Sequence, residues 1–161
     1  MQQSQASQHI IAVGFSLGSV IAAYVARHRL VAGLILVTPF DSLEALARDL
    51  YWRAPVRLLL RHHMPTIEFV PGSLAPAALI IAARDKIVPA RRSAALRRAV
   101  SNLVFERTID AGHNDIYDHP AFAEAMREAL ATIEAASVGL HGRLDQVQAF
   151  SAKSGRLHSG S

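Results

Sequence analysis

The segment from residue 9 to residue 29, HIIAVGFSLGSVIAAYVARHR, constrains the fold more than any other part of this chain. Its first residues are apolar and rich in β-branched side chains, which favour a buried strand over residues 9–14. The residues from 17 to 28 are apolar nearly all round, which predicts a helix in a central position. The segment therefore predicts a strand, a sharp turn with Ser16 at its tip, and a helix.

The turn itself reads Gly14-Phe15-Ser16-Leu17-Gly18. In this setting Gly-x-Ser-x-Gly is the pattern of a nucleophile elbow, where a strained turn exposes a serine hydroxyl. We expect both glycines to let the strand and the helix approach without Cβ clashes. The alternative is a tight strand-to-helix turn in which Ser16 only caps the helix that follows. The motif by itself leaves both interpretations open.

Three further apolar runs follow, and each has the length of a strand. Residues 30–38 and 77–83 are continuously apolar, as parallel strands are when helices cover both faces of their sheet. Residues 103–110 are interrupted by polar side chains at 106–108, which is typical of an edge strand. Helical patterns at 90–100 and from Phe122 to Ile133 alternate with these runs. The alternation predicts a mostly parallel α/β sheet of about four strands flanked by helices.

Two segments depart from this alternation. Residues 41–70 are too long for a simple crossover and are divided by Pro55 and Pro65, so we expect two or three short helices forming a cap over the carboxyl ends of the strands. Within the cap, an arginine recurs every four residues, which would put Arg53, Arg57 and Arg61 on one helix face. This face is either a stripe in contact with solvent or a surface that steers an anionic substrate. The predicted domain covers residues 1–137, and residues 138–161 are expected to form a disordered tail. Asp118 or His119 can cap the last helix, with Pro120 in its first turn.

Composition narrows the class of protein. A chain of 161 residues suits one domain with a real core, and no uncharged run reaches the roughly 18 residues that cross a bilayer. The first residues have no secretory pattern, so we expect a cytoplasmic location for the chain as given, while an upstream signal or anchor stays open. The net charge of +4 comes from scattered basic residues without interleaved aromatic rings, which favours solvated helix faces over nucleic-acid binding.

Metal and cofactor chemistry finds no support in the sequence. The chain has no cysteine, so disulfides and thiolate metal sites are excluded. The histidines at positions 28, 62, 63 and 141 lack partners at ligand spacing. Gly14 and Gly18 fit neither the dinucleotide pattern nor the phosphate-binding loop. We therefore expect no cofactor and no metal.

Candidate catalytic residues follow three of the predicted strands. A serine nucleophile needs a base, and the base needs an acid that fixes its tautomer. With this kind of turn the expected chain order is Ser, Asp or Glu, then His, and Ser16, Asp85 and His113 have that order. All three lie at carboxyl ends of parallel strands, where α/β sheets bind ligands. Asp41, Asp110 and Asp115 compete with Asp85 for the acid role, and Asp41 is the better candidate for a helix cap.

Four motifs in the chain resemble the α/β-hydrolase superfamily, particularly bacterial acyl hydrolases and serine-aminopeptidase-like enzymes. They are GFSLGS at 14–19, LVTPFDSL at 36–43, ARDKIVPARRS at 83–93 and AGHND at 111–115, and the resemblance extends over about residues 8–135. It implies a serine hydrolase that cleaves an ester, amide or thioester of a small-molecule acyl substrate through an acyl-enzyme. By the same resemblance Ser16 is the nucleophile, Asp85 the acid partner and His113 the base. The backbone N–H of Leu17 would be one oxyanion-hole donor.

The chain departs from that superfamily before the predicted elbow. Only about eight residues precede the first strand, whereas such hydrolases carry several strands and the loop of the second oxyanion donor there. We therefore expect the carboxyl half of an α/β-hydrolase domain, weak activity, and self-association through an exposed sheet edge. The alternative function is a catalytically inactive hydrolase fragment or a remnant that binds a partner.

Overall fold

The described part of the chain contains one four-stranded parallel sheet. A computed structural model describes the backbone of residues 10–51 and 65–155, and the side chains of these ranges up to residue 139. Neighbouring strands pair in chain order, β1-β2-β3-β4, and every pair is parallel. The predicted α/β architecture of about four parallel strands is therefore confirmed. The strands are Ile11–Phe15 (β1), Gly33–Val37 (β2), Ala77–Ala82 (β3) and Leu103–Ile109 (β4).

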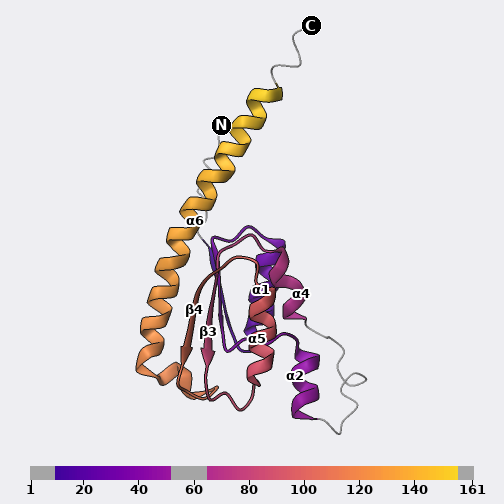
Figure 1. Cartoon of the computed structure of the whole chain (residues 1–161), viewed down its shortest axis with the longest axis vertical. Coiled ribbons are helices and arrows are strands. Elements are labelled where there is room, and N and C mark those ends of the chain that lie inside the picture. The colour runs from indigo at the N-terminus through magenta and orange to yellow at the C-terminus, as the bar shows by residue number, and fades with distance from the viewer. Residues whose placement is uncertain (1–9, 52–64, 156–161) are drawn as a thin grey trace.

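Helices cover the sheet from both sides. Figure 1 shows α1, α4 and α5 on one face and the long helix α6 on the other. Each face has its own apolar cluster, one centred on Leu34, Leu36 and Leu79, the other on Ile35, Ile80 and side chains of α6. The helices are Gly18–His28 (α1), Leu43–Leu50 (α2), Thr66–Phe69 (α4), Ala90–Ala99 (α5) and Pro120–Gly155 (α6), with 3-10 turns Val70–Gly72 (η1) and Asp115–Asp118 (η2).

The two edges of the described sheet are β1 and β4. The edge position predicted for residues 103–110 is confirmed, since β4 pairs with β3 only. Helix α1 does not have the central position that its apolar character predicted. Its Ala23 is fully buried against the sheet, but Ile21 and Tyr24 on its other side are 60% and 51% exposed. Of this outer face, Tyr24 makes an edge contact with the ring of Phe69 on α4, and Ile21 is left mostly exposed.

The segment predicted as a cap divides into two described parts. Helix α2 begins after Ser42, whose hydroxyl accepts a hydrogen bond from the N–H of Ala45, and it lies toward the carboxyl ends of the strands (Figure 1). Helix α4 instead packs against α1 and α5, so it lies beside the sheet rather than over the strand ends. Residues 52–64, with the predicted arginine stripe, lie outside the described residues.

Helix α6 begins at Pro120, and the ring Nδ1 of His119 accepts a hydrogen bond from the N–H of Ala121. His119, rather than Asp118, thus supports the first turn. The helix continues to Gly155, where the sequence predicted a disordered tail from residue 138. The first half of α6 packs on the sheet, and this packing offsets the unfavourable nucleation of the helix. After Pro120 the sequence has no proline that would stop the helix from continuing. Over the described ranges, no helix is both long enough and apolar enough to cross a bilayer.

Candidate active site

Strand β1 leads into the turn that carries Ser16. Ser16 has a φ of 46°, in the left-handed region that non-glycine residues seldom occupy, and its N–H donates to the carbonyl of Val37. A Cβ on Gly14 would lie 2.6 Å from the carbonyl oxygen of Gly18 and from Cα of Ser19, so only glycine allows this close contact of strand and helix. A Cβ on Gly18 would meet nothing within 4 Å. The steric role predicted for both glycines is therefore confirmed at Gly14 and wrong at Gly18.

The Ser16 side chain does not cap helix α1. The N-cap residue is Leu17, and no side-chain hydrogen bond caps this helix. Instead, Oγ of Ser16 lies 2.8 Å from Nε2 of His113, and Nδ1 of His113 lies 2.6 Å from Oδ2 of Asp85. The three residues follow β1, β3 and β4, whose carboxyl ends meet at one edge of the sheet. The structure thus joins the three predicted residues in one hydrogen-bonded series.

The loop after β3 fixes the charge of Asp85. Burial alone would raise the pKa of Asp85, but the hydrogen bond with His113 and those from the N–H groups of Val88 and Ile87 outweigh it, so the pKa lies below its usual value. An ionised carboxylate only accepts hydrogen bonds, so Nδ1 of the neutral imidazole is the donor to Asp85. Nε2 is then an acceptor, and the Ser16 hydroxyl donates to it. This is the arrangement in which a serine can lose its proton to histidine.

The competing carboxylates have other partners. Asp41 accepts hydrogen bonds from the N–H of Ser42 and from Arg92. It supports the start of α2, although Ser42 is the N-cap residue. Asp110 is exposed and pairs with Arg84. Asp115 lies at the start of η2 against Gly112. Of the four candidate carboxylates, it is Asp85 that contacts His113.

Two more features lie near Ser16: the backbone N–H of Leu17 and the threonine that follows the neighbouring strand β2. No hydrogen bond from the N–H of Leu17 to another described residue is present, which leaves this donor available beside the serine. Thr38, which follows β2, is buried and also has a φ of 46°. A β-branched residue in this region is an outlier, and such strain clusters at functional sites. Sequence reasoning missed Thr38, because only its place between a strand and Pro39 marks it.

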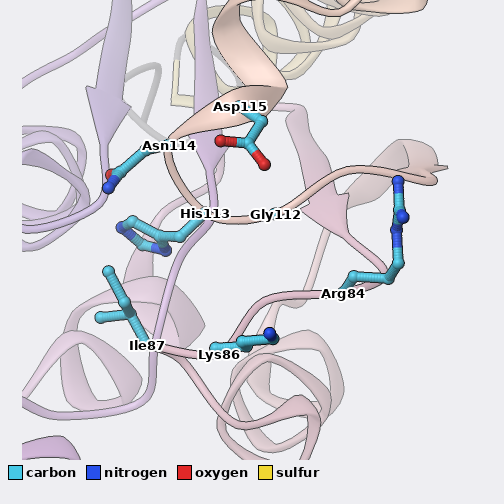
Figure 2. Close-up of a pocket in the computed structure, with 7 residues that line it drawn as sticks. All are labelled: Arg84, Lys86, Ile87, Gly112, His113, Asn114 and Asp115. Atoms are coloured by element: carbon cyan, nitrogen blue, oxygen red, sulfur yellow. The ribbon is translucent and has the colours of Figure 1, made fainter.

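An open pocket of about 330 Å³ borders His113. Figure 2 shows it between the loop that follows β3 and the loop that follows β4. On another side of the site, the ring of Tyr117 makes edge contacts with Phe15 and Phe122, and its hydroxyl lies 3.5 Å from Oγ1 of Thr38. The pocket therefore offers room beside the imidazole. It is lined by Arg84, Lys86, Ile87, Gly112, His113, Asn114 and Asp115.

Comparison with known sequences finds relatives of greater length. An uncharacterised protein of Mycobacterium tuberculosis, from strains CDC 1551 and H37Rv, is 35% identical over 120 residues. The match covers 73% of this chain and 43% of the relative, so the chain spans less than half the length of these curated relatives. No family model matches the chain.

Comparison with solved structures identifies the fold. A bacterial membrane phospholipase A matches with a TM-score of 0.60 at 16% identity, over 75% of this chain and 56% of that one. The acylaminoacyl peptidase of Pyrococcus horikoshii matches with a TM-score of 0.58 at 13% identity, over 74% and 22% of the two chains. The esterase Pf2001 of Pyrococcus furiosus matches with a TM-score of 0.52 at 20% identity, over 76% and 52%. The described residues thus form part of an α/β-hydrolase fold.

Proposed function

We propose that this chain carries the catalytic residues of a serine hydrolase that cleaves an ester, amide or thioester through an acyl-enzyme. The observation that carries the proposal is the hydrogen-bonded series from Ser16 through His113 to Asp85, at the carboxyl end of the sheet. The positive φ of Ser16 supports it, because backbone strain at a turn is part of how such a fold exposes a nucleophile.

In the first half of the reaction, Oγ of Ser16 attacks the carbonyl carbon of the substrate while its proton passes to Nε2 of His113. Asp85 stabilises the imidazolium that forms. The negative charge that develops on the carbonyl oxygen is stabilised by the N–H of Leu17, which has no described partner. When the bond to the leaving group breaks, His113 returns the proton to that group and the acyl-enzyme remains.

In the second half, a water molecule gives a proton to His113 and attacks the acyl carbon, and the proton then returns to Ser16. The pocket beside His113 supports this sequence, since it leaves space for the departing group and for water. The described residues supply one oxyanion donor beside Ser16, the N–H of Leu17, and an enzyme that loses a donor typically turns over about 10²–10³-fold more slowly. With this donor alone we expect weak turnover.

The proposal is tested by treating the purified chain with a fluorophosphonate probe and with a chromogenic short-chain ester. We expect covalent labelling that is lost in Ser16→Ala, with turnover lowered by at least about 10³-fold. The matched control is Ser101→Ala, because Ser101 is exposed and its hydroxyl donates to the carbonyl of Pro71. Ser101 precedes β4 and so lies at the opposite end of this strand from His113. Absence of labelling in the folded chain would instead support the alternative function, an inactive fragment that binds a partner.

A further inference from the structure

The hydrogen bond between Ser16 and His113 joins two parts of the chain that lie apart in the sheet. Ser16 follows β1 and His113 follows β4, and strands β2 and β3 lie between these two strands. The loop after β4 must therefore extend over the ends of two strands before Nε2 of His113 comes within 2.8 Å of Oγ of Ser16. Asp85 follows the adjacent strand β3, so its contact with His113 crosses a shorter distance. Of the two hydrogen bonds, the one with Ser16 depends more on what holds this loop across the sheet.

Tyr117 connects the loop to the strand that carries Ser16. It lies in η2, four residues after His113, and its ring makes an edge contact with the ring of Phe15 at 5.8 Å between centroids. Phe15 is the residue directly before Ser16. A second edge contact, at 5.7 Å, joins Tyr117 to Phe122 of α6. Edge-to-face geometry is favourable for aromatic rings, so the ring of Tyr117 is held from both β1 and α6.

The turn that holds Tyr117 also holds His113. The N–H of Ile116 donates to the carbonyl of Gly112, which closes one turn of backbone around His113. Ile116 itself is fully buried in the apolar cluster that includes side chains of α6. Because a short closed turn joins the two side chains, a shift of the Tyr117 ring would displace His113 as well.

Thr38 gives Tyr117 a further neighbour, at the end of β2. Its side chain is buried, and its hydroxyl lies 3.5 Å from that of Tyr117. The strained backbone of Thr38 is held from the next residue, since the hydroxyl of Ser93 donates to the carbonyl of Pro39. A separation of 3.5 Å is longer than the roughly 2.7–2.8 Å of an ordinary O–H···O hydrogen bond, so the two hydroxyl groups attract each other weakly. The ring of Tyr117, rather than its hydroxyl, therefore makes the connection.

We propose that Tyr117 is a positioning residue for the pair Ser16 and His113. Its ring, in contact with Phe15 and Phe122, sets the distance between Oγ of the serine and Nε2 of the histidine. The proposal rests on the proposed function, because this distance matters only if a proton passes between the two atoms. Proton transfer needs a separation of about 2.6–3.2 Å between heavy atoms. A displacement of about 1 Å can lower a rate about 100-fold, so a side chain can control turnover without touching the reacting atoms.

The test is the rate at which the fluorophosphonate probe labels Ser16, together with kcat and KM on the chromogenic ester. Tyr117→Leu removes both ring contacts, and we expect it to lower the labelling rate and kcat about 10–100-fold with KM unchanged. Tyr117→Phe keeps the ring and should retain most of the wild-type rate. The matched control is Tyr24→Leu, because Tyr24 makes a similar edge contact, with Phe69 at 5.3 Å, in the second half of α1. This control should lose stability without slower labelling.

A second variant removes the same contact from its other partner. Phe15→Leu takes away the ring that Tyr117 contacts on β1, so it keeps the proposal testable if Tyr117→Leu fails to fold. In the double variant the two losses in labelling rate should not multiply, because both act through one contact. Circular dichroism and urea unfolding verify that each variant is folded under the conditions of the assay.

The outcomes distinguish this proposal from the proposed function. Labelling of Tyr117→Leu at the wild-type rate, with wild-type labelling dependent on Ser16, would overturn the role of Tyr117 and leave the proposed function intact. An equal loss in Tyr117→Phe would also overturn it, since the hydroxyl rather than the ring would then matter. A rise in KM with kcat unchanged would mean that Tyr117 binds substrate directly, which contradicts positioning. A folded wild-type chain without labelling would remove the proposed function and this role together.

Discussion

Gly14 and Gly18 stand at equal distances from Ser16 in the sequence, but the space around them differs. A methyl group on Gly14 would collide with backbone at 2.6 Å, which cannot yield as a side chain does. We expect Gly14→Ala to lower the free energy of unfolding by about 1–3 kcal/mol. The displaced turn should also reduce labelling of Ser16. Gly18→Ala, by contrast, meets open space at the start of α1 and should keep or raise stability.

Urea unfolding of the two glycine variants is the measurement. Equal stability of Gly14→Ala and Gly18→Ala would contradict the contact geometry of the turn. The comparison is informative because the sequence motif treats the two positions alike. Spacing predicts which residues border the turn, but only the direction in which each Cα–Cβ bond points decides which of them is crowded.

Asp85 holds the imidazole of His113 in one tautomer, and this role can be separated from that of the nearby carboxylates. We expect Asp85→Asn to lower turnover by about 10³-fold or more, because an amide can donate to Nδ1 and leave the proton on Nε2. Asp110→Asn is the control, since Asp110 is exposed and contacts Arg84 rather than His113. Steady-state kinetics on the chromogenic ester measures both. Similar losses in the two variants would argue against the assigned acid.

The chain order of Ser16, Asp85 and His113 and their places after strands predicted that the three side chains lie together, and the structure brings them together because parallel strands have their carboxyl ends at one edge. The left-handed backbone conformation of Thr38 could not be predicted in this way. Its φ of 46° has no signature in residue type, since a threonine before a proline normally favours extended backbone. Strain of this kind is imposed by tertiary packing.

Helices α2 and α5 are joined by a partly buried ionic cluster. Arg92 of α5 bonds both carboxylate oxygens of Asp49 on α2, and it also bonds Asp41 just before that helix. We expect Arg92→Met to lower the free energy of unfolding by about 1–3 kcal/mol, because it leaves two carboxylates without their shared partner. Arg91→Met should cost about 0.5 kcal/mol or less, since Arg91 binds Asp49 from an exposed position. Urea unfolding at neutral pH distinguishes the two.

The same cluster predicts a pH dependence. The pKa of Asp49 is lowered from 3.8 to about 2, mainly by hydrogen bonds from Arg92 and to a smaller extent by that from Arg91. These hydrogen bonds outweigh the effect of burial, which by itself would raise this pKa. A carboxyl group with a depressed folded-state pKa contributes stability fully above its unfolded pKa. That contribution is lost as the pH falls from about 4 to 2. The stability difference between wild type and Arg92→Met should therefore be largest near neutral pH and shrink at pH 3. A constant difference would contradict the assignment.

Elements with strong apolar periodicity were predicted well from the sequence, and the failures have physical causes. All four strands lie within or overlap their predicted runs, because short apolar runs between helical patterns are typical of the strands of a parallel sheet. Helix α1 was expected to be central because its sequence is apolar all round. In the described structure that apolar surface is instead partly exposed. Composition predicts that a face can be buried, but not which partner covers it.

At the scale of the whole molecule, helix α6 has two different halves. Its first half packs on the sheet, with Ala125, Ala129 and Ile133 fully buried and Ser137 nearly so, whereas Val138 is 70% exposed. Figure 1 shows the rest of the helix extending past the body of the molecule. Among the residues of α6 whose side chains are described, up to residue 139, the last one buried against the body is Ser137.

The difference between the two halves of α6 predicts how removal of the residues after 139 affects thermal stability and helix content. We expect the thermal midpoint of the body to stay within about 2 °C, because every buried position of α6 in the described side chains is retained. Because α6 continues to Gly155, the far-ultraviolet circular dichroism of the full chain should exceed that of the shortened chain by the helical signal of residues 140–155. Equal helical signals would contradict this extent of the helix. A large drop in the thermal midpoint would mean that these residues stabilise the body, against the packing of α6.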